Sequence, residues 1–122
     1  MAGGYRADLN RDPVLSTERL DKACIVRLCG EIDLYNAPAV REALLAACSD
    51  GPERVVVDLS EVEFLDSTAL GALVEARTRL PNREGFILAA PGPEARRALE
   101  IAGLDRHFAV QDTVPEALEK SI

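Results

Sequence analysis

The sequence predicts a single α/β domain with a mostly parallel, mixed sheet of four or five strands, an antiparallel edge strand and about four helices. Segments rich in β-branched and aliphatic residues alternate with segments whose apolar residues recur every three or four positions. Strands joined through helices require right-handed crossovers, which place those strands parallel. The length of 122 residues fits one domain, whose core needs neither a disulfide nor a metal for stability.

The beginning of the chain contains an arm and two strands. Residues 1–13 include two glycines and a proline without apolar periodicity, so we expect a flexible N-terminal arm there and a domain over residues 14–122. Residues 14–20 fit a short edge strand. Residues 23–28, ACIVRL, are almost entirely apolar, which predicts a buried strand.

A helix and a central strand follow. Apolar residues share one helical face between positions 37 and 47, with Asn36 as the expected N-cap. Residues 54–59, RVVVDL, contain three successive valines, which indicates a central strand covered on both faces. Ser60 and Glu61 are predicted to form a turn after that strand.

The second half of the chain continues the alternation. A helical pattern begins near Ala69 and ends at Leu80. The remaining predicted elements are a strand at 86–90, a helix at 94–103, a brief strand at 108–110 and a helix that begins near Pro115.

Composition and charge argue against two classes of partner. The chain is 48% hydrophobic and 29% charged, and no apolar run of about 18 residues occurs, so no membrane association is predicted. The net charge is −7 and the arginines are scattered, which disfavours direct binding to nucleic acid. The first 13 residues do not resemble a secretory signal, and we expect a cytoplasmic protein.

The three cysteines are expected to be buried free thiols, because no CxxC motif occurs. Cys24 and Cys29 would lie about 17 Å apart on one predicted strand, whereas a disulfide requires Cα atoms within about 7 Å. A redox role that pairs one of them with Cys48 stays open.

Motifs for catalysis and cofactor binding are missing from the sequence. His107 is the only histidine, and no G-x-S-x-G elbow surrounds Ser67. Neither of the two glycine-rich phosphate-binding motifs occurs. Asp58 and Asp66 would make a weak Mg²⁺ site, since no third ligand is evident. We therefore expect no enzymatic activity, no cofactor and no bound metal.

An apolar stretch breaks at Asp66-Ser67-Thr68 and then resumes with helical periodicity. The Ser67 hydroxyl is expected to cap the helix that begins near Ala69, which would contribute about 1 kcal/mol. A cap does not explain why two small residues, Ala69 and Gly71, follow. We expect both to be exposed and to leave the backbone open to a partner, although Gly costs a helix about 1 kcal/mol relative to Ala.

Three stretches of the sequence match motifs of a known domain family. Residues 30–33, GEID, followed by NA at 36–37, are similar to the signature G-E-[LI]-D-x-x-[TN]-A. Residues 55–60, VVVDLS, are similar to the family's central strand, and residues 65–71, LDSTALG, to its D-S-[ST]-G-[LI]-[GA] switch. On these stretches the chain resembles the STAS domain from about Leu20 to its end, and most closely the bacterial anti-sigma-factor antagonists.

The resemblance implies a STAS-type fold and a switch mechanism. In this family the antagonist binds a cytoplasmic anti-sigma factor that is also a serine kinase, and the sigma factor is released. The kinase phosphorylates the switch serine, the modified antagonist dissociates, and a serine phosphatase restores it. Carried over by position, the acceptor is Ser67, with Thr68 as the alternative.

The resemblance also implies a partner-binding surface around the acceptor. Its residues are Glu31, Asp33, Asn36, Asp66, Ser67, Thr68, Ala69 and Gly71. Ala69 departs from the family pattern, which has Gly there, and its Cβ limits how closely a partner backbone can approach. Two alternatives stay open: a weak homodimer, and a non-phosphorylated STAS module that binds a protein or a small ligand such as a nucleotide.

Overall fold

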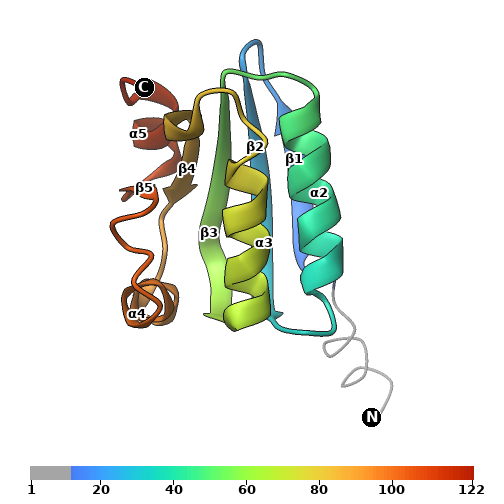
Figure 1. Cartoon of the computed structure of the whole chain (residues 1–122), viewed down its shortest axis with the longest axis vertical. Coiled ribbons are helices and arrows are strands. Elements are labelled where there is room, and N and C mark those ends of the chain that lie inside the picture. The colour runs from blue at the N-terminus through green and yellow to red at the C-terminus, as the bar shows by residue number, and fades with distance from the viewer. Residues whose placement is uncertain (1–11) are drawn as a thin grey trace.

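The computed structural model describes residues 12–122 and contains a five-stranded mixed sheet (Figure 1). The strands, in spatial order, are β1 (Val14–Arg19), β2 (Ala23–Ile32), β3 (Arg54–Leu65), β4 (Phe86–Ala89) and β5 (Ala109–Gln111). β1 pairs antiparallel with β2, and the other pairs are parallel. The predicted fold class is therefore confirmed.

Helices cover both faces of the sheet. Those in the described part of the chain are α2 (Ala37–Ser49), α3 (Ser67–Arg77), α4 (Pro93–Ile101) and α5 (Val114–Glu119), with a 3-10 turn, η1 (Arg83–Gly85). Figure 1 shows α2 and α3 side by side in front of β1, β2 and β3. None of the helices in residues 12–122 is long and apolar enough to cross a membrane.

Two apolar cores lie on opposite faces of the sheet. Val55 and Val57 of β3 point into the larger core, which α2, α3 and α4 cover. Val56 points into the smaller core, which α5 closes with Ala117. Because successive side chains of a strand alternate between faces, the run of three valines requires cover on both sides, as predicted.

β3 is longer than the sequence indicated. The turn predicted at Ser60 and Glu61 is wrong, since β3 continues through these residues to Leu65. β2 also runs on to Ile32, whose Cα partner is Leu65, so the ladder between the two strands satisfies the backbone that a turn would have left unpaired. β4 pairs only with positions 55–58 of β3, so β2 and β3 project beyond it.

The cysteines are buried and free, as predicted. The Cys48 thiol donates a hydrogen bond to the Ala76 carbonyl at 3.5 Å. Burial, and then the neighbouring Cys24 thiol, raise the pKa of Cys48 to about 11. The predicted arm at residues 1–13 lies mostly outside the described residues, but Pro13 is buried, and its carbonyl accepts from the Cys29 N–H at 2.9 Å.

We predict that Gly85→Ala lowers the free energy of unfolding by about 1–3 kcal/mol, the usual cost of overpacking. Gly85 is buried, and a Cβ there would overlap the backbone carbonyl oxygen of Glu53. Gly71→Ala is the control: its Cβ would meet nothing within 4 Å, and Ala favours helix by about 1 kcal/mol. Urea unfolding measures both, and equal stability of the two variants would contradict this account.

Candidate functional site

The segments singled out in the sequence meet at one end of the molecule. Figure 1 shows that β2 and β3 end, and α2 and α3 begin, at the lower edge of the view. This follows from the parallel pairing of β2 and β3, which brings their carboxyl ends together. We call this edge the switch end; it comprises residues 31–36 and 61–71.

Asp66, rather than Ser67, caps α3. The Asp66 carboxylate accepts a hydrogen bond from the Ala69 N–H at 3.0 Å, and its own N–H donates to the Ile32 carbonyl at 3.1 Å. The prediction that the Ser67 hydroxyl caps the helix is wrong, because α3 begins at Ser67 instead of near Ala69. Ser67 therefore occupies the first turn, where its hydroxyl is not needed as a cap.

The Asp66 carboxylate also joins α3 to the loop between β2 and α2. Partial burial alone would raise the pKa of this carboxyl, but hydrogen bonds from the Ala69 N–H, from Thr68 and from the Leu34 N–H outweigh it. The pKa of Asp66 consequently lies below its ordinary value, and the side chain is ionised at neutral pH. Asp66 thus fixes two segments that are far apart in the sequence, because its carboxylate caps α3 and its N–H binds the end of β2.

Ser67 and Thr68 are both exposed, but their hydroxyls differ. The Thr68 hydroxyl donates to the Asp66 carboxylate. Within residues 12–122, no hydrogen bond ties down the Ser67 hydroxyl, which is therefore free to meet a partner. This difference favours Ser67 over Thr68 as an acceptor.

The loop after β2 is held by Asp33 and Asn36. The Asn36 amide accepts from the Asp33 N–H and donates to the Glu31 carbonyl, both at 2.8 Å. The Asp33 carboxylate accepts from the Tyr35 N–H at 2.9 Å. Asn36 stands at the N-cap position of α2 as predicted, but its side chain makes no cap bond because these loop contacts occupy it.

Two small residues of α3 have different environments. Gly71 is exposed, as expected. Ala69 was expected to be exposed, but it is only 1% exposed. It lies four residues before Leu73 and seven before Ala76, and these three side chains share the face that packs on the sheet. Ala69 therefore contributes its N–H to the Asp66 cap, while its side chain belongs to the core.

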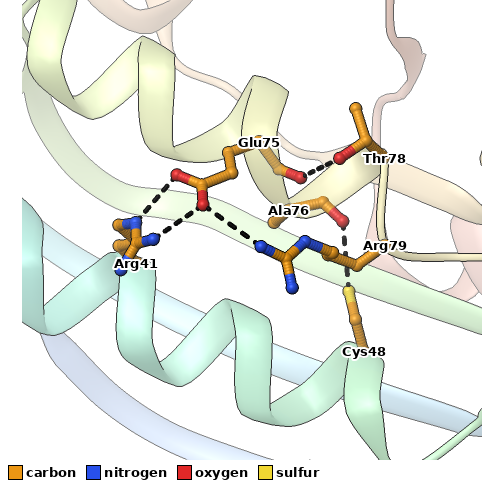
Figure 2. Close-up of polar contacts among 6 residues, drawn as sticks. All are labelled: Arg41, Cys48, Glu75, Ala76, Thr78 and Arg79. Carbon is orange, nitrogen blue, oxygen red and sulfur yellow. Dashed lines mark hydrogen bonds and ion pairs between the residues drawn. The ribbon is translucent and has the colours of Figure 1, made fainter.

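An ion-pair network holds α3 against α2, as Figure 2 shows. The Arg41 guanidinium of α2 donates to both carboxylate oxygens of Glu75 at 2.7 Å, and Arg79 lies 3.6 Å from the second oxygen. The hydrogen bond from Arg41 is the main cause that lowers the pKa of Glu75. The network, together with the Cys48 contact to Ala76, restrains α3 near its C-terminal end, and Asp66 restrains it at its start.

The sequence analysis missed Leu34 and Tyr35. They are 62% and 90% exposed, and they project from the loop between Asp33 and Asn36. The available signal was the presence of two large apolar residues inside a segment that otherwise has the composition of a polar loop.

The switch end consists largely of exposed and half-exposed side chains, and the one histidine of the sequence lies outside it. His107 is exposed and its ring packs edge-on against Phe108, with the ring centroids 5.2 Å apart. Across residues 12–122, no group of three His, Cys, Asp or Glu side chains could hold a metal ion. An open cavity of about 300 Å³ lies at the opposite end, lined by residues 19–24 and 50–53.

Comparisons with known proteins agree with the fold. The family model of the STAS domain matches residues 15–117. The chain is 36% identical over 94 residues to the anti-sigma-F factor antagonist RsfB of Mycobacterium tuberculosis, which covers 77% of each chain. It is 34% identical over 92 residues to the anti-sigma-B factor antagonist of Staphylococcus aureus, which covers 74% of this chain and 84% of that one.

A solved structure of a relative has the same fold. The crystal structure of an anti-sigma factor antagonist from Mycobacterium paratuberculosis superimposes with a TM-score of 0.78 at 39% identity. The superposition covers 84% of this chain and 88% of that one.

We predict that Asp66→Ala lowers the free energy of unfolding by about 1–2 kcal/mol, because α3 loses its N-cap. Ser67→Ala is the matched control one residue away, and it should change stability by no more than about 0.5 kcal/mol. Both are measured by urea unfolding at pH 7. The reverse order of effects would mean that Ser67 is the cap after all.

Proposed function

The chain belongs to the STAS domain family, and we propose that within it this protein is an anti-sigma factor antagonist. It binds a cytoplasmic anti-sigma factor that is also a serine kinase, so that a sigma factor is released for transcription. The names of its relatives in Mycobacterium tuberculosis and Staphylococcus aureus support this assignment. The role is regulatory, and no catalytic step is assigned to the chain itself.

The observation that carries the proposal is the exposed Ser67 hydroxyl in the first turn of α3. Asp66 performs the capping, which leaves Ser67 without a structural task. The proposed mechanism is a switch in which the kinase phosphorylates Ser67, the antagonist dissociates, and a serine phosphatase removes the phosphate. Thr68 is the less favoured acceptor because its hydroxyl is engaged by Asp66.

Phosphorylation should leave the domain folded. A phosphate adds about −1.5 to −2 charges at neutral pH. The N-terminus of a helix favours negative charge by about 0.3–1 kcal/mol, and Ser67 occupies the first turn of an 11-residue helix. The opposing charges of Asp66 and Glu31 act largely through water, so their repulsion is weak.

Phosphorylation should weaken partner binding much more than it changes the stability of the domain. A phosphate that is buried at an interface without a matching cation leaves a desolvated charge, at a cost of several kcal/mol. A penalty of about 3–5 kcal/mol weakens binding by roughly 10²- to 10³-fold or more. The switch therefore requires charge and bulk at one position and no rearrangement of the fold.

The proposed partner surface consists of the exposed and half-exposed residues of the switch end. They are Glu31, Asp33, Asn36, Asp66, Ser67, Thr68 and Gly71. Asp33 and Asn36 act mainly by holding the loop through their mutual hydrogen bonds. Ala69 acts through its backbone because its side chain is buried.

Incubation with the anti-sigma factor kinase of the source organism and ATP should place one phosphate on Ser67. Digestion followed by mass spectrometry of the peptides locates it, and Ser67→Ala should abolish the modification. Phosphate found only outside Ser67 and Thr68 would refute the switch.

Ser67→Asp should weaken binding to the same anti-sigma factor by at least about tenfold, which corresponds to 1.4 kcal/mol. Its thermal midpoint should stay within a few degrees of the wild type, since Asp is favoured in a first helical turn. Ser121→Asp adds the same charge at an exposed position near the C-terminus and should bind normally. If Ser67→Asp unfolds instead, the loss of binding reflects stability and the switch model fails.

A further inference from the structure

Large apolar side chains are exposed at the switch end. The structure exposes seven of them within residues 12–122, and three lie here: Leu34 at 62%, Tyr35 at 90% and Phe64 at 46%. Single exposed apolar residues are ordinary on protein surfaces. Leu34 and Tyr35 differ because they are adjacent in the chain. We call these two residues the apolar tip.

The apolar tip is presented by a rigid frame. The Asp33 carboxylate accepts from the Tyr35 N–H, and the Asn36 amide closes the loop through the Asp33 N–H. The Asp66 N–H donates to the carbonyl of Ile32, two residues before Leu34, at 3.1 Å. A loop that is already ordered loses little conformational freedom on binding, which favours its use as a contact.

The same hydrogen bond places the tip beside the switch. Asp66 is bonded to Ile32, two residues before Leu34, and directly precedes Ser67 in the chain. A partner that covers Ser67 therefore meets the tip in the same contact. A phosphate on Ser67 would stand at the border of the apolar contact, where desolvation of a charge is most costly.

Carboxylates flank the tip. Every charged residue within positions 31–36 and 61–67 is acidic, and there are five of them. Glu31 and Phe64 are Cα partners on β2 and β3. Their neighbours Ile32 and Leu65 point into the helix-covered core, so Glu31 and Phe64 point to the other face of the sheet. This acidic side lies across the sheet from α3 and its Ser67.

We infer that the apolar tip, and Tyr35 above all, is the anchor that inserts into an apolar depression on the anti-sigma factor, with Lys or Arg side chains of that partner facing Glu31. The inference rests on the proposed function and names the partner chemistry of the same surface. Tyrosines in such positions are frequent interface hot spots. The charge pairs with Glu31 lie on one side of the tip, and the apolar contact lies on the Ser67 side.

The acidic charge around the apolar tip indicates which kind of partner binds there. A second copy of the chain would bring the same acidic flanks into contact with these, and each chain carries a net charge of −7. An anionic lipid surface is disfavoured for the same reason. A protein with a basic rim around an apolar centre satisfies both features of the surface.

The test compares Tyr35→Ser with Ile101→Ser in the full-length chain. Ile101 is 76% exposed on α4 and provides a control of similar exposure away from the tip. Each purified anti-sigma factor of the source organism is titrated with the wild type and both variants. We expect Tyr35→Ser to raise the Kd at least tenfold and Ile101→Ser to change it less than twofold. Thermal midpoints confirm that both variants are folded, and Leu34→Ser provides a second variant.

Further measurements distinguish a binding role of Tyr35 from an effect on phosphorylation itself. Tyr35→Ser should raise the KM for phosphorylation of Ser67 while kcat stays within threefold, because the acceptor is untouched. Glu31→Gln should reduce the salt dependence of the association rate. A Kd of Tyr35→Ser within twofold of the wild type overturns the inference while leaving the proposed function intact.

Two other outcomes would also overturn it. If the wild type binds none of the anti-sigma factors, the proposed function and the inference fail together. If sedimentation shows a wild-type dimer that Tyr35→Ser converts to monomer, the occupant of the tip is a second copy of the chain.

Discussion

The hydrogen bonds of the Asp66 carboxylate and backbone determine the form of the switch end. The carboxylate accepts from the Ala69 N–H, and the Asp66 N–H donates to the Ile32 carbonyl at the end of β2. These bonds set where α3 begins and keep the loop after β2 beside it. Because Asp66 satisfies the first turn, the neighbouring Ser67 hydroxyl remains free. The exposure of the Ser67 hydroxyl, the proposed acceptor, is thus a consequence of how the helix start is stabilised.

Much of the architecture was predictable because it follows from local periodicity. The three valines of β3 required cover on both faces, and the apolar face of α2 matched the helical repeat. Ser60 and Glu61 were misassigned because their composition is that of a turn, whereas β3 continues through a register shift before Glu61 and pairs this residue with Cys29 of the extended β2. A ladder with a distant strand is a tertiary effect, and local propensity cannot reveal it.

The candidate site also contains some features that the sequence predicts and others that it does not. The motif located Ser67 and Gly71 correctly at the surface, but Ala69 was placed there wrongly because a difference of one helical position decides between core and solvent. The bond from the Asp66 N–H to the Ile32 carbonyl and the pairing of Arg41 with Glu75 join residues more than 30 positions apart. Such contacts depend on how the helices pack on the sheet, and no spacing in the sequence encodes them.

The raised pKa of Cys48 makes its thiol slow to react with oxidants. With a pKa of about 11, only about one molecule in ten thousand carries a thiolate there at pH 7. Peroxide and disulfide reagents attack the thiolate, so a buried thiol in this state reacts slowly with oxidants. Oxidative conditions would therefore modify Cys48 much more slowly than an exposed thiol of ordinary pKa.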